Sequence, residues 1–270
     1  MSDLIKPVRL NLQDFTPARV SQPMSGDSLA TSEVLSFQLA HARARDAVHA
    51  ALDLPTFSQH LQGELNVAGA SLSILQLRTN ASDRASYLRR PDLGRTLDSD
   101  SADKLQANPC DLVVVIADGL SALAVERNAI PLLAHLLPKL FAEGWNLAPL
   151  TVVQQGRVAI GDPIGFRLGA RLSLVLIGER PGLSSPDSLG AYLTWNPEPG
   201  RIDADRNCLS NIREGGLSAG SAADRLFWYL QAARARQMTG TSLKEGLPEP
   251  GASPPLPEPA KSVHSPRTRP

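Results

Sequence analysis

The chain has 270 residues, with 27 lysines and arginines against 27 aspartates and glutamates, and only two cysteines. This balance gives no global field that would attract nucleic acid or an anionic membrane, and no apolar run is long enough to span a bilayer. Two cysteines, Cys110 and Cys208, and no secretory signal indicate a cytoplasmic protein in a reducing compartment, in which we expect no disulfide.

The two ends of the chain differ in composition from its middle. The first 30 residues are interrupted by Pro7, Pro17 and Pro23, and eight of the 22 prolines lie from Gly246 onward, where no apolar core is present. Such segments bury too little apolar surface to become ordered. We therefore predict a flexible segment over 1–30, a helical N-terminal region over 31–109, an α/β domain over 110–240 and a disordered tail over 241–270.

The first helix is predicted to begin at Thr31 or Ser32, because either hydroxyl can accept a hydrogen bond from the free N–H groups of a first helical turn. Further along, Arg45 and His49 are four residues apart and share a face. That face is either solvated or pairs with a partner or an anionic ligand. His41 and His49 have no third ligand nearby in the sequence, so the pattern predicts no metal site.

Residues 50–109 follow a less regular pattern. Pro55 and Gly63 bound a short segment of uncertain structure, and residues 72–77 fit either a strand or a helical turn. The sequence YLRRPDLGRTL, residues 87–97, predicts a stiff loop rich in arginine. Residues 100–107 predict a helix.

From residue 110 onward, predicted strands and helices alternate. This order predicts an α/β fold with a mostly parallel, Rossmann-like sheet flanked by helices, a helical N-terminal segment and disordered ends. Residues 156–160 either continue the preceding strand or form a hairpin arm. The predicted strands are 111–116, 150–154, 172–177 and 191–195, and the predicted helices are 121–127, 129–143, 163–168 and 219–237.

Two of these strands end at an acidic residue beside a glycine. The first is followed by Asp118 and Gly119, and another by Gly178 and Glu179. Because open α/β sheets bind ligands at the carboxyl ends of their strands, these residues predict one shared crevice. The alternative is that the glycines only permit turns and the acids cap helices.

Common catalytic and nucleotide-binding motifs are absent from the sequence. There is no Gly-x-Gly-x-x-Gly at a strand end, no phosphate-binding Gly-x-x-x-x-Gly-Lys, no Cys-x-x-Cys and no His-Glu-x-x-His. The residues alone therefore predict a ligand-binding α/β domain without a complete catalytic set.

Six segments, which follow one another in this order along the chain, together resemble a known family. They are FQLAHARARDAVH, YLRRPDLGR, VIADGLSA, GRVAIGDPIG, IGERPGLSSPDSLGAYLTW and DADRNCLSNIREGG. Over residues 30–238 the chain closely resembles the small (light) subunit of ethanolamine ammonia-lyase. Two departures are minor: residues 22–30 lack a glycine-arginine pattern, and the loop from Glu179 to Cys208 is one residue shorter than in some relatives.

The resemblance implies an adenosylcobalamin-dependent radical enzyme that converts ethanolamine to acetaldehyde and ammonia. In that family a large subunit, built as a β/α barrel, holds the substrate and the catalytic groups, and the small subunit covers the cofactor. The family's cobalamin keeps its dimethylbenzimidazole on cobalt. This agrees with the absence here of Asp-x-His-x-x-Gly, the motif whose histidine ligates cobalt.

Carried over by motif, the implied cofactor contacts are Val158, Glu179 and Cys208, with no catalytic and no metal residue in this chain. A carboxylate accepts hydrogen bonds from the amide groups on a corrin rim, and a valine and a thiol offer apolar surface. Further candidates for the same crevice are Asp118, Arg157, Arg180, Ser210 and Asn211.

Two other functions remain open from the sequence. A stand-alone α/β regulatory domain would bind a nucleotide-like ligand tightly without a partner, and a purely structural subunit would contact no cofactor. The family also leaves two locations open, free in the cytoplasm or inside a bacterial microcompartment.

Overall fold

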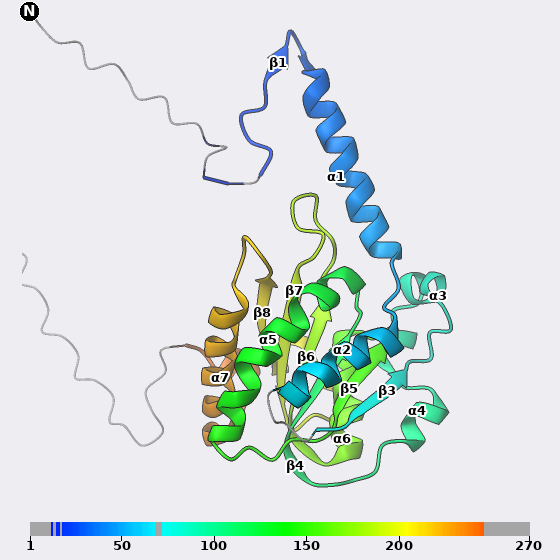
Figure 1. Cartoon of the computed structure of the whole chain (residues 1–270), viewed down its shortest axis with the longest axis vertical. Coiled ribbons are helices and arrows are strands. Elements are labelled where there is room, and N and C mark those ends of the chain that lie inside the picture. Colours follow the sequence, from blue (N-terminus) through cyan, green and yellow to red (C-terminus); the bar gives the residue numbers. More distant parts are fainter. Residues whose placement is uncertain (1–11, 13–14, 17, 68–71, 246–270) are drawn as a thin grey trace, which may run out of the picture.

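A six-stranded mixed sheet forms the centre of the computed structural model, which describes residues 12, 15–16, 18–67 and 72–245 (Figure 1). The strands follow the order β3-β5-β4-β6-β7-β8, in which the first four are parallel and the last two antiparallel to their neighbours. The strands are β3 (Ile74–Arg78), β4 (Cys110–Ala117), β5 (Leu150–Gln154), β6 (Ala170–Gly178), β7 (Leu189–Trp195) and β8 (Arg206–Ile212).

The α/β class predicted from the alternating elements is confirmed, but the sheet has an antiparallel end that the alternation did not predict. β7 follows β6 through a loop rather than a helix, so it returns beside β6 in the opposite direction. β8 was not predicted as a strand at all. β3 confirms the strand alternative for residues 72–77 within a region otherwise predicted to be helical, and it is the opposite edge strand of this sheet.

Helices cover both faces of the sheet. The first face packs against α2 (Leu54–Val67), α5 (Ala122–Ala142) and α7 (Ala219–Arg236), and the second against α6 (Gly161–Leu168) and the 3-10 turn Val158–Ile160. Successive residues of β4 alternate between these layers, because side chains along a strand point to opposite faces. Its even-numbered apolar residues Leu112, Val114 and Ile116 face the first layer, and Val113, Val115 and Ala117 face the second.

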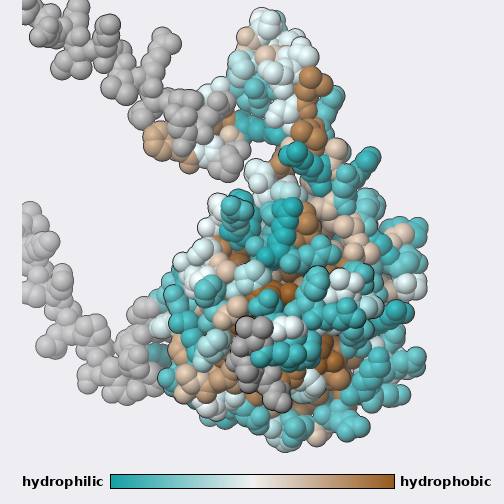
Figure 2. All heavy atoms as spheres, in the orientation of Figure 1, coloured by the Kyte–Doolittle hydropathy of each residue, from teal (hydrophilic) through white to brown (hydrophobic). Residues whose placement is uncertain are grey.

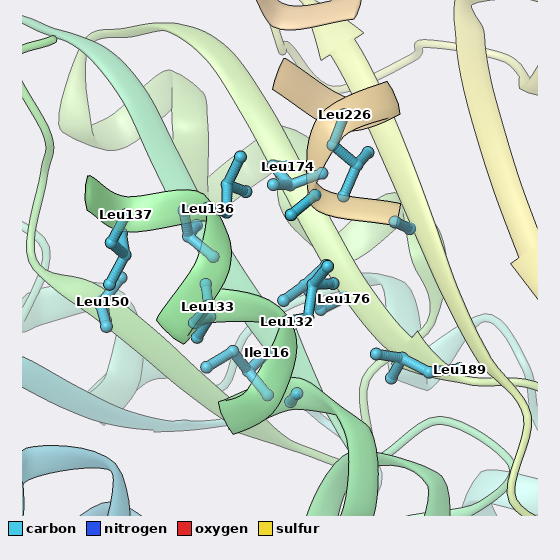
Figure 3. Packing of buried hydrophobic residues seen from close by; sticks show 14 of the residues in the cluster. Ile116, Leu132, Leu133, Leu136, Leu137, Leu150, Leu174, Leu176, Leu189 and Leu226 are labelled. Carbon is cyan, nitrogen blue, oxygen red and sulfur yellow. The ribbon is translucent and has the colours of Figure 1, made fainter. Parts of the chain in front are cut away.

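α5 is one continuous helix, where the sequence predicted two. Its buried stripe includes Leu132, Leu133 and Leu136, which pack over the first face of the sheet (Figure 3). Pro131 and Pro138 lie within the helix on its exposed side. Each proline removes one backbone hydrogen bond, and on this side the freed carbonyl can be hydrated, so the helix continues.

Other elements differ from the predictions in their extent. The segment between Pro55 and Gly63 lies within α2. The predicted arginine-rich loop overlaps a helix, α3 (Arg84–Arg89), and the predicted helix 100–107 is only α4 (Ser99–Asp103). Residues 156–160 contain a 3-10 turn that leads into α6, and they form no strand.

α1 (Thr31–His49) begins where the sequence predicted and projects away from the sheet (Figure 1). At its far end β1 (Met24–Ser25) and β2 (Ser28–Leu29) form a short antiparallel pair. We call residues 24–49 the arm. Ala47 is the one buried residue of α1, so the arm packs very little against the core of the sheet.

The described part of the chain ends at residue 245, just after a buried contact. Leu243 is buried in the first-face core, and the Asn207 amide nitrogen donates to the carbonyl oxygens of Gly240 and Leu243, at 3.1 and 2.8 Å. The chain up to Leu243 thus belongs to the folded body. Residues 246–270 of the tail predicted to be disordered lie outside the described residues. So do residues 1–11, 13–14 and 17 of the predicted flexible segment 1–30.

Candidate functional site

The carboxyl ends of β4 and β6 approach each other closely, and two glycines make this possible. Gly119 has a positive φ of 56°, and the Leu120 N–H donates to the Gly178 carbonyl oxygen at 2.9 Å. A Cβ atom on Gly119 would overlap that oxygen, and one on Gly178 would overlap the Ser121 carbonyl oxygen. The glycines are therefore needed for this close approach as well as for the turns.

A hollow of about 400 Å³ opens at this edge of the sheet, and we call it the strand-end pocket. Val158 enters it from the 3-10 turn after β5, and Glu179 and Arg180 enter it from the loop after β6. Two of the three predicted cofactor contacts thus lie in one pocket. The lining residues are Tyr87, Leu120, Arg157, Val158, Ile177, Gly178, Glu179, Arg180 and Tyr192.

Neighbouring groups hold Glu179 in place by hydrogen bonds to one oxygen only. Its Oε2 accepts from the Ser188 hydroxyl and, at 3.1 Å, from the backbone N–H of Asn211. Its Oε1 accepts no hydrogen bond from the described residues. Asn211 has a positive φ of 59°, which turns its N–H toward Glu179 at the end of β8. One carboxylate oxygen therefore remains available to a ligand.

Cys208 lies beside the pocket and not in its wall. It is directly opposite Tyr192, a lining residue, in the β7–β8 ladder, so both side chains point to the same face of the sheet. Although Cys208 is exposed on one side, desolvation by its neighbours raises the pKa of the thiol, and the Glu179 carboxylate acts in the same direction. The thiol is therefore neutral at pH 7 and unsuited to nucleophilic attack.

Tyr87 forms the floor of the pocket between two guanidinium groups. Arg157 lies 4.1 Å and Arg84 lies 4.8 Å from the centre of its ring, both within the range of cation–π contact. The Tyr87 hydroxyl donates to the Gly156 carbonyl oxygen at 3.0 Å, and Arg157 Nη2 donates to the Tyr87 carbonyl oxygen at 3.0 Å. Burial raises the pKa of Tyr87 far above its ordinary value, so the ring stays neutral.

Asp118 does not line the pocket, contrary to its candidate role, but lies fully buried beneath it. Its Oδ1 accepts from the Gly156 N–H at 3.2 Å, and its Oδ2 is 3.9 Å from Arg84 Nη1. Burial raises the pKa of Asp118 to about 6, although the Gln155 and Gly156 backbone groups and Arg84 oppose this. Asp118 is therefore a buried structural group of the strand ends.

Arg84 joins this buried group to the base of the arm. Its Nε donates to the Val48 carbonyl oxygen in the last turn of α1, and its Nη1 donates to the Gly119 carbonyl oxygen, both at 2.7 Å. Arg84 therefore holds the end of α1 against the loop after β4, at the same edge of the sheet as the strand-end pocket.

The second face of β8 is partly open next to the pocket. Cys208 and Ser210 are exposed on this face of β8, which contrasts with the buried second-face residues of β4. Ser210 and Asn211, two further candidates, are not lining residues, but the backbone of Asn211 binds Glu179. The pocket is thus continuous with an uncovered strip of sheet.

The described residues include no group of three or more His, Cys, Asp or Glu side chains placed to hold a metal ion. Cys110 and Cys208 are free thiols. In the same part of the chain, no helix combines the length and apolarity needed to cross a membrane.

Comparison with known proteins identifies the family. The model of the family described as ethanolamine ammonia-lyase light chain (EutC) matches residues 8–244. The chain belongs to this family. It is 51% identical over 251 residues to a protein of Bradyrhizobium diazoefficiens named ethanolamine ammonia-lyase small subunit, covering 91% of this chain and 94% of that protein. Proteins of the same name from Pseudomonas putida W619 and Pseudomonas fluorescens SBW25 are 50% and 49% identical, over 87% and 88% of this chain and 87% and 89% of theirs.

The light-chain match includes the arm, the sheet and all residues of the strand-end pocket. It ends within the described C-terminal contact, one residue before Glu245, whose carboxylate pairs with Arg225 at 3.0 Å. The resemblance seen in the sequence to the ethanolamine ammonia-lyase small subunit is therefore confirmed at the level of the family.

Two aromatic lining residues of this light chain were missed in the sequence, Tyr87 and Tyr192. Tyr87 is the first residue of YLRRPDLGR, one of the segments that carries the resemblance, and an aromatic ring next to several arginines was a usable signal for stacking. Tyr192 lies within a predicted strand, where its alternation with Leu193 indicates a side chain on the other face.

Proposed function

We propose that this chain is the small subunit of an adenosylcobalamin-dependent ethanolamine ammonia-lyase, which converts ethanolamine to acetaldehyde and ammonia. In this proposal it covers the cobalamin at an interface with a catalytic large subunit. The observation that carries the proposal is the strand-end pocket, which combines Val158 with a Glu179 oxygen free to accept a hydrogen bond, in a chain of the light-chain family.

The pocket residues fit one side of a corrinoid. A corrin rim carries both apolar edges and amide groups, and this pocket offers Val158, Ile177 and Tyr192 beside a carboxylate. Its volume of about 400 Å³ is too small to enclose the whole cofactor. The exposed second face of β8 at Cys208 and Ser210 supports the same view, because a second protein surface would have to complete the site.

Each proposed contact has a separate physical role. Glu179 Oε1 accepts an N–H from a rim amide, while Ser188 and Asn211 hold the other oxygen still. Val158 excludes water from the rim, and Cys208, a neutral thiol beside Tyr192, adds a small apolar surface. When bound, adenosylcobalamin supplies the radical chemistry. We assign this chain no catalytic residue, and the large subunit supplies the groups that handle the substrate.

The proposal is tested by mixing purified chains. This chain alone, with adenosylcobalamin and ethanolamine, is expected to release no acetaldehyde, whereas the mixture with a large subunit of a related ethanolamine ammonia-lyase is expected to release it continuously. Acetaldehyde is measured by coupled oxidation of a nicotinamide cofactor. Turnover by this chain alone, or a mixture without activity although both chains are folded, contradicts the assignment.

Replacement of Glu179 tests the proposed contact. Glu179→Ala is expected to weaken adenosylcobalamin binding to the assembled enzyme by about 1–3 kcal/mol, since a charge-assisted hydrogen bond is lost. Glu179→Gln keeps an acceptor without the charge and should have a smaller effect. Binding is measured by spectrophotometric titration of the cofactor. The matched control is Glu143→Ala, at the exposed C-terminal end of α5. If all variants bind the cofactor with equal affinity, Glu179 is not part of the cofactor site.

The two other functions make different predictions for the isolated chain. A stand-alone regulatory domain would bind its ligand tightly without a large subunit, whereas a half-site should bind cobalamin weakly until the partner is added. A purely structural subunit would show no change in cofactor affinity on Glu179→Ala. The location of the protein, free in the cytoplasm or in a bacterial microcompartment, stays a prediction.

A further inference from the structure

The exposed apolar side chains of this protein are concentrated near the N-terminus. Of the 14 large apolar residues that are exposed in the described part of the chain, eight lie before residue 40. On the arm, Leu35 and Leu39 are 59% and 52% exposed. Figure 2 shows hydrophobic residues at the surface of the projection that the arm forms. Such a concentration is typical of a surface that binds another protein.

One face of α1 has no partner within the described structure. Leu35, Leu39 and Arg43 are spaced by four residues and form a single stripe, which we call the arm stripe. Phe37 lies on a different side of α1. There the guanidinium carbon of Arg19 is 5.4 Å from the centre of the Phe37 ring. Arg43 makes no ion pair with any described residue. Because helices gain most of their stability from packing, a helix this exposed is expected to be covered in its working state.

The arm stripe leads into a second hollow, of about 490 Å³, which we call the arm hollow. It lies between the last turns of α1 and the first turns of α5, and Arg43 and Pro186 are both in its wall. Its lining residues are Arg43, Asp46, Ala47, Ala50, Leu123, Glu126, Arg127 and Pro186.

The arm hollow and the strand-end pocket are on either side of one loop. The loop from Glu179 to Ser188 begins in the wall of the strand-end pocket and supplies Pro186 to the arm hollow. Figure 1 shows that α1 projects from the same edge of the sheet as the loop between β6 and β7. A protein that covers the pocket at this edge is therefore within reach of the arm.

We propose that the arm stripe docks on the same large subunit that covers the strand-end pocket, in an apolar groove that ends at a carboxylate facing Arg43. This inference rests on the proposed function. A second copy of this chain fits less well. Antiparallel pairing of two stripes about Leu39 would place Arg43 opposite Leu35, so the charge would have no acidic partner.

Two charge-inserting variants of the full chain test the docking surface. Leu35→Glu with Leu39→Glu keeps good helix formers at exposed positions, so the fold is expected to be unchanged. The amount of variant needed for half-maximal lyase activity with the large subunit should rise by at least about 100-fold, because burial of two leucines is lost. The activity at saturation should stay the same. Arg43→Glu should raise the half-maximal amount less, and this effect should shrink at high salt.

The control and the remaining outcomes separate this inference from the proposed function. Phe166→Glu places the same charge on a side chain that is 61% exposed on α6, away from the arm, and should leave assembly unchanged. If the wild-type chain activates the large subunit and the double variant does so at the same concentration, the docking surface is wrong and the proposed function stands. If the wild-type chain does not activate it, the proposed function fails. A wild-type dimer that the double variant abolishes, seen by light scattering, would instead identify a second copy as the occupant.

Discussion

Replacing Arg206 with alanine is expected to destabilise the protein by about 3–5 kcal/mol, because the change leaves a buried carboxylate without its counter-ion. The guanidinium group of Arg206 binds both oxygens of Asp162 at 2.7 Å and the Thr194 hydroxyl at 2.8 Å. The side chains of Arg206 and Asp162 are 2% and 3% exposed. The pair fastens β8 to α6, so its loss should also loosen the strand that carries Cys208.

Urea unfolding, followed by circular dichroism, measures this loss. A matched control is Arg90→Ala, which breaks an ion pair of the same length, 2.7 Å, between side chains that are 64% and 59% exposed. That change should cost little stability, because water and salt screen an exposed ion pair. The double variant Arg206→Met with Asp162→Leu should recover most of the lost stability, because no unpaired charge stays buried. Equal losses for Arg206→Ala and Arg90→Ala would show that the buried pair has no special importance.

Asp118→Asn is expected to change how stability depends on pH. Burial raises the pKa of this carboxyl group from an ordinary value of about 3.9 to about 6. The folded protein therefore binds this proton more tightly than the unfolded chain does. The resulting stabilisation is fully present below pH 4 and is lost as the pH rises through 6, a difference of about 3 kcal/mol.

The free energy of unfolding should be compared between the wild type and Asp118→Asn at several values from pH 4 to pH 7. Other groups titrate in both proteins and cancel in the difference. The wild type should lose stability relative to the variant as the pH rises, with most of the change between pH 4 and 6. A difference that stays constant over this range would show that Asp118 does not retain its proton in the folded state.

Local patterns were sufficient to predict several elements of the fold. α1 begins at Thr31 as predicted, although its N-cap is Ala30 and no side chain caps it, so the reason given for that start was wrong. The apolar runs over 111–116 and 172–177 are central strands. β8 escaped prediction because one of its faces is partly exposed and the buried residue on that face, Arg206, is charged. Leu209 and Ile212 point inward there, while Cys208 and Ser210 are exposed, so no apolar run marks the strand. The period-2 pattern of such a strand is short and easily broken.

The candidate site was only partly predictable from the residues. Glu179 was found because it follows a buried strand and a glycine, and the structure places it in a pocket with Val158, a residue that only the family resemblance indicated. Asp118 follows a strand and precedes a glycine in the same manner, yet it is buried under Tyr87. Which of two similar strand ends faces solvent depends on packing by α3, a contact between distant segments that no local pattern contains.

The loop from Glu179 to Ser188 has a consequence for cooperativity. Its second half is tied to α5 through Ser121, whose hydroxyl donates to the Pro186 carbonyl oxygen at 2.8 Å, and through Arg127, which pairs with Asp187 at 2.8 Å. A short loop with one end in each hollow cannot be fixed at one end without restricting the other. If the cofactor and the large subunit bind as proposed, reciprocal linkage requires that cofactor binding and subunit assembly strengthen each other by the same free energy.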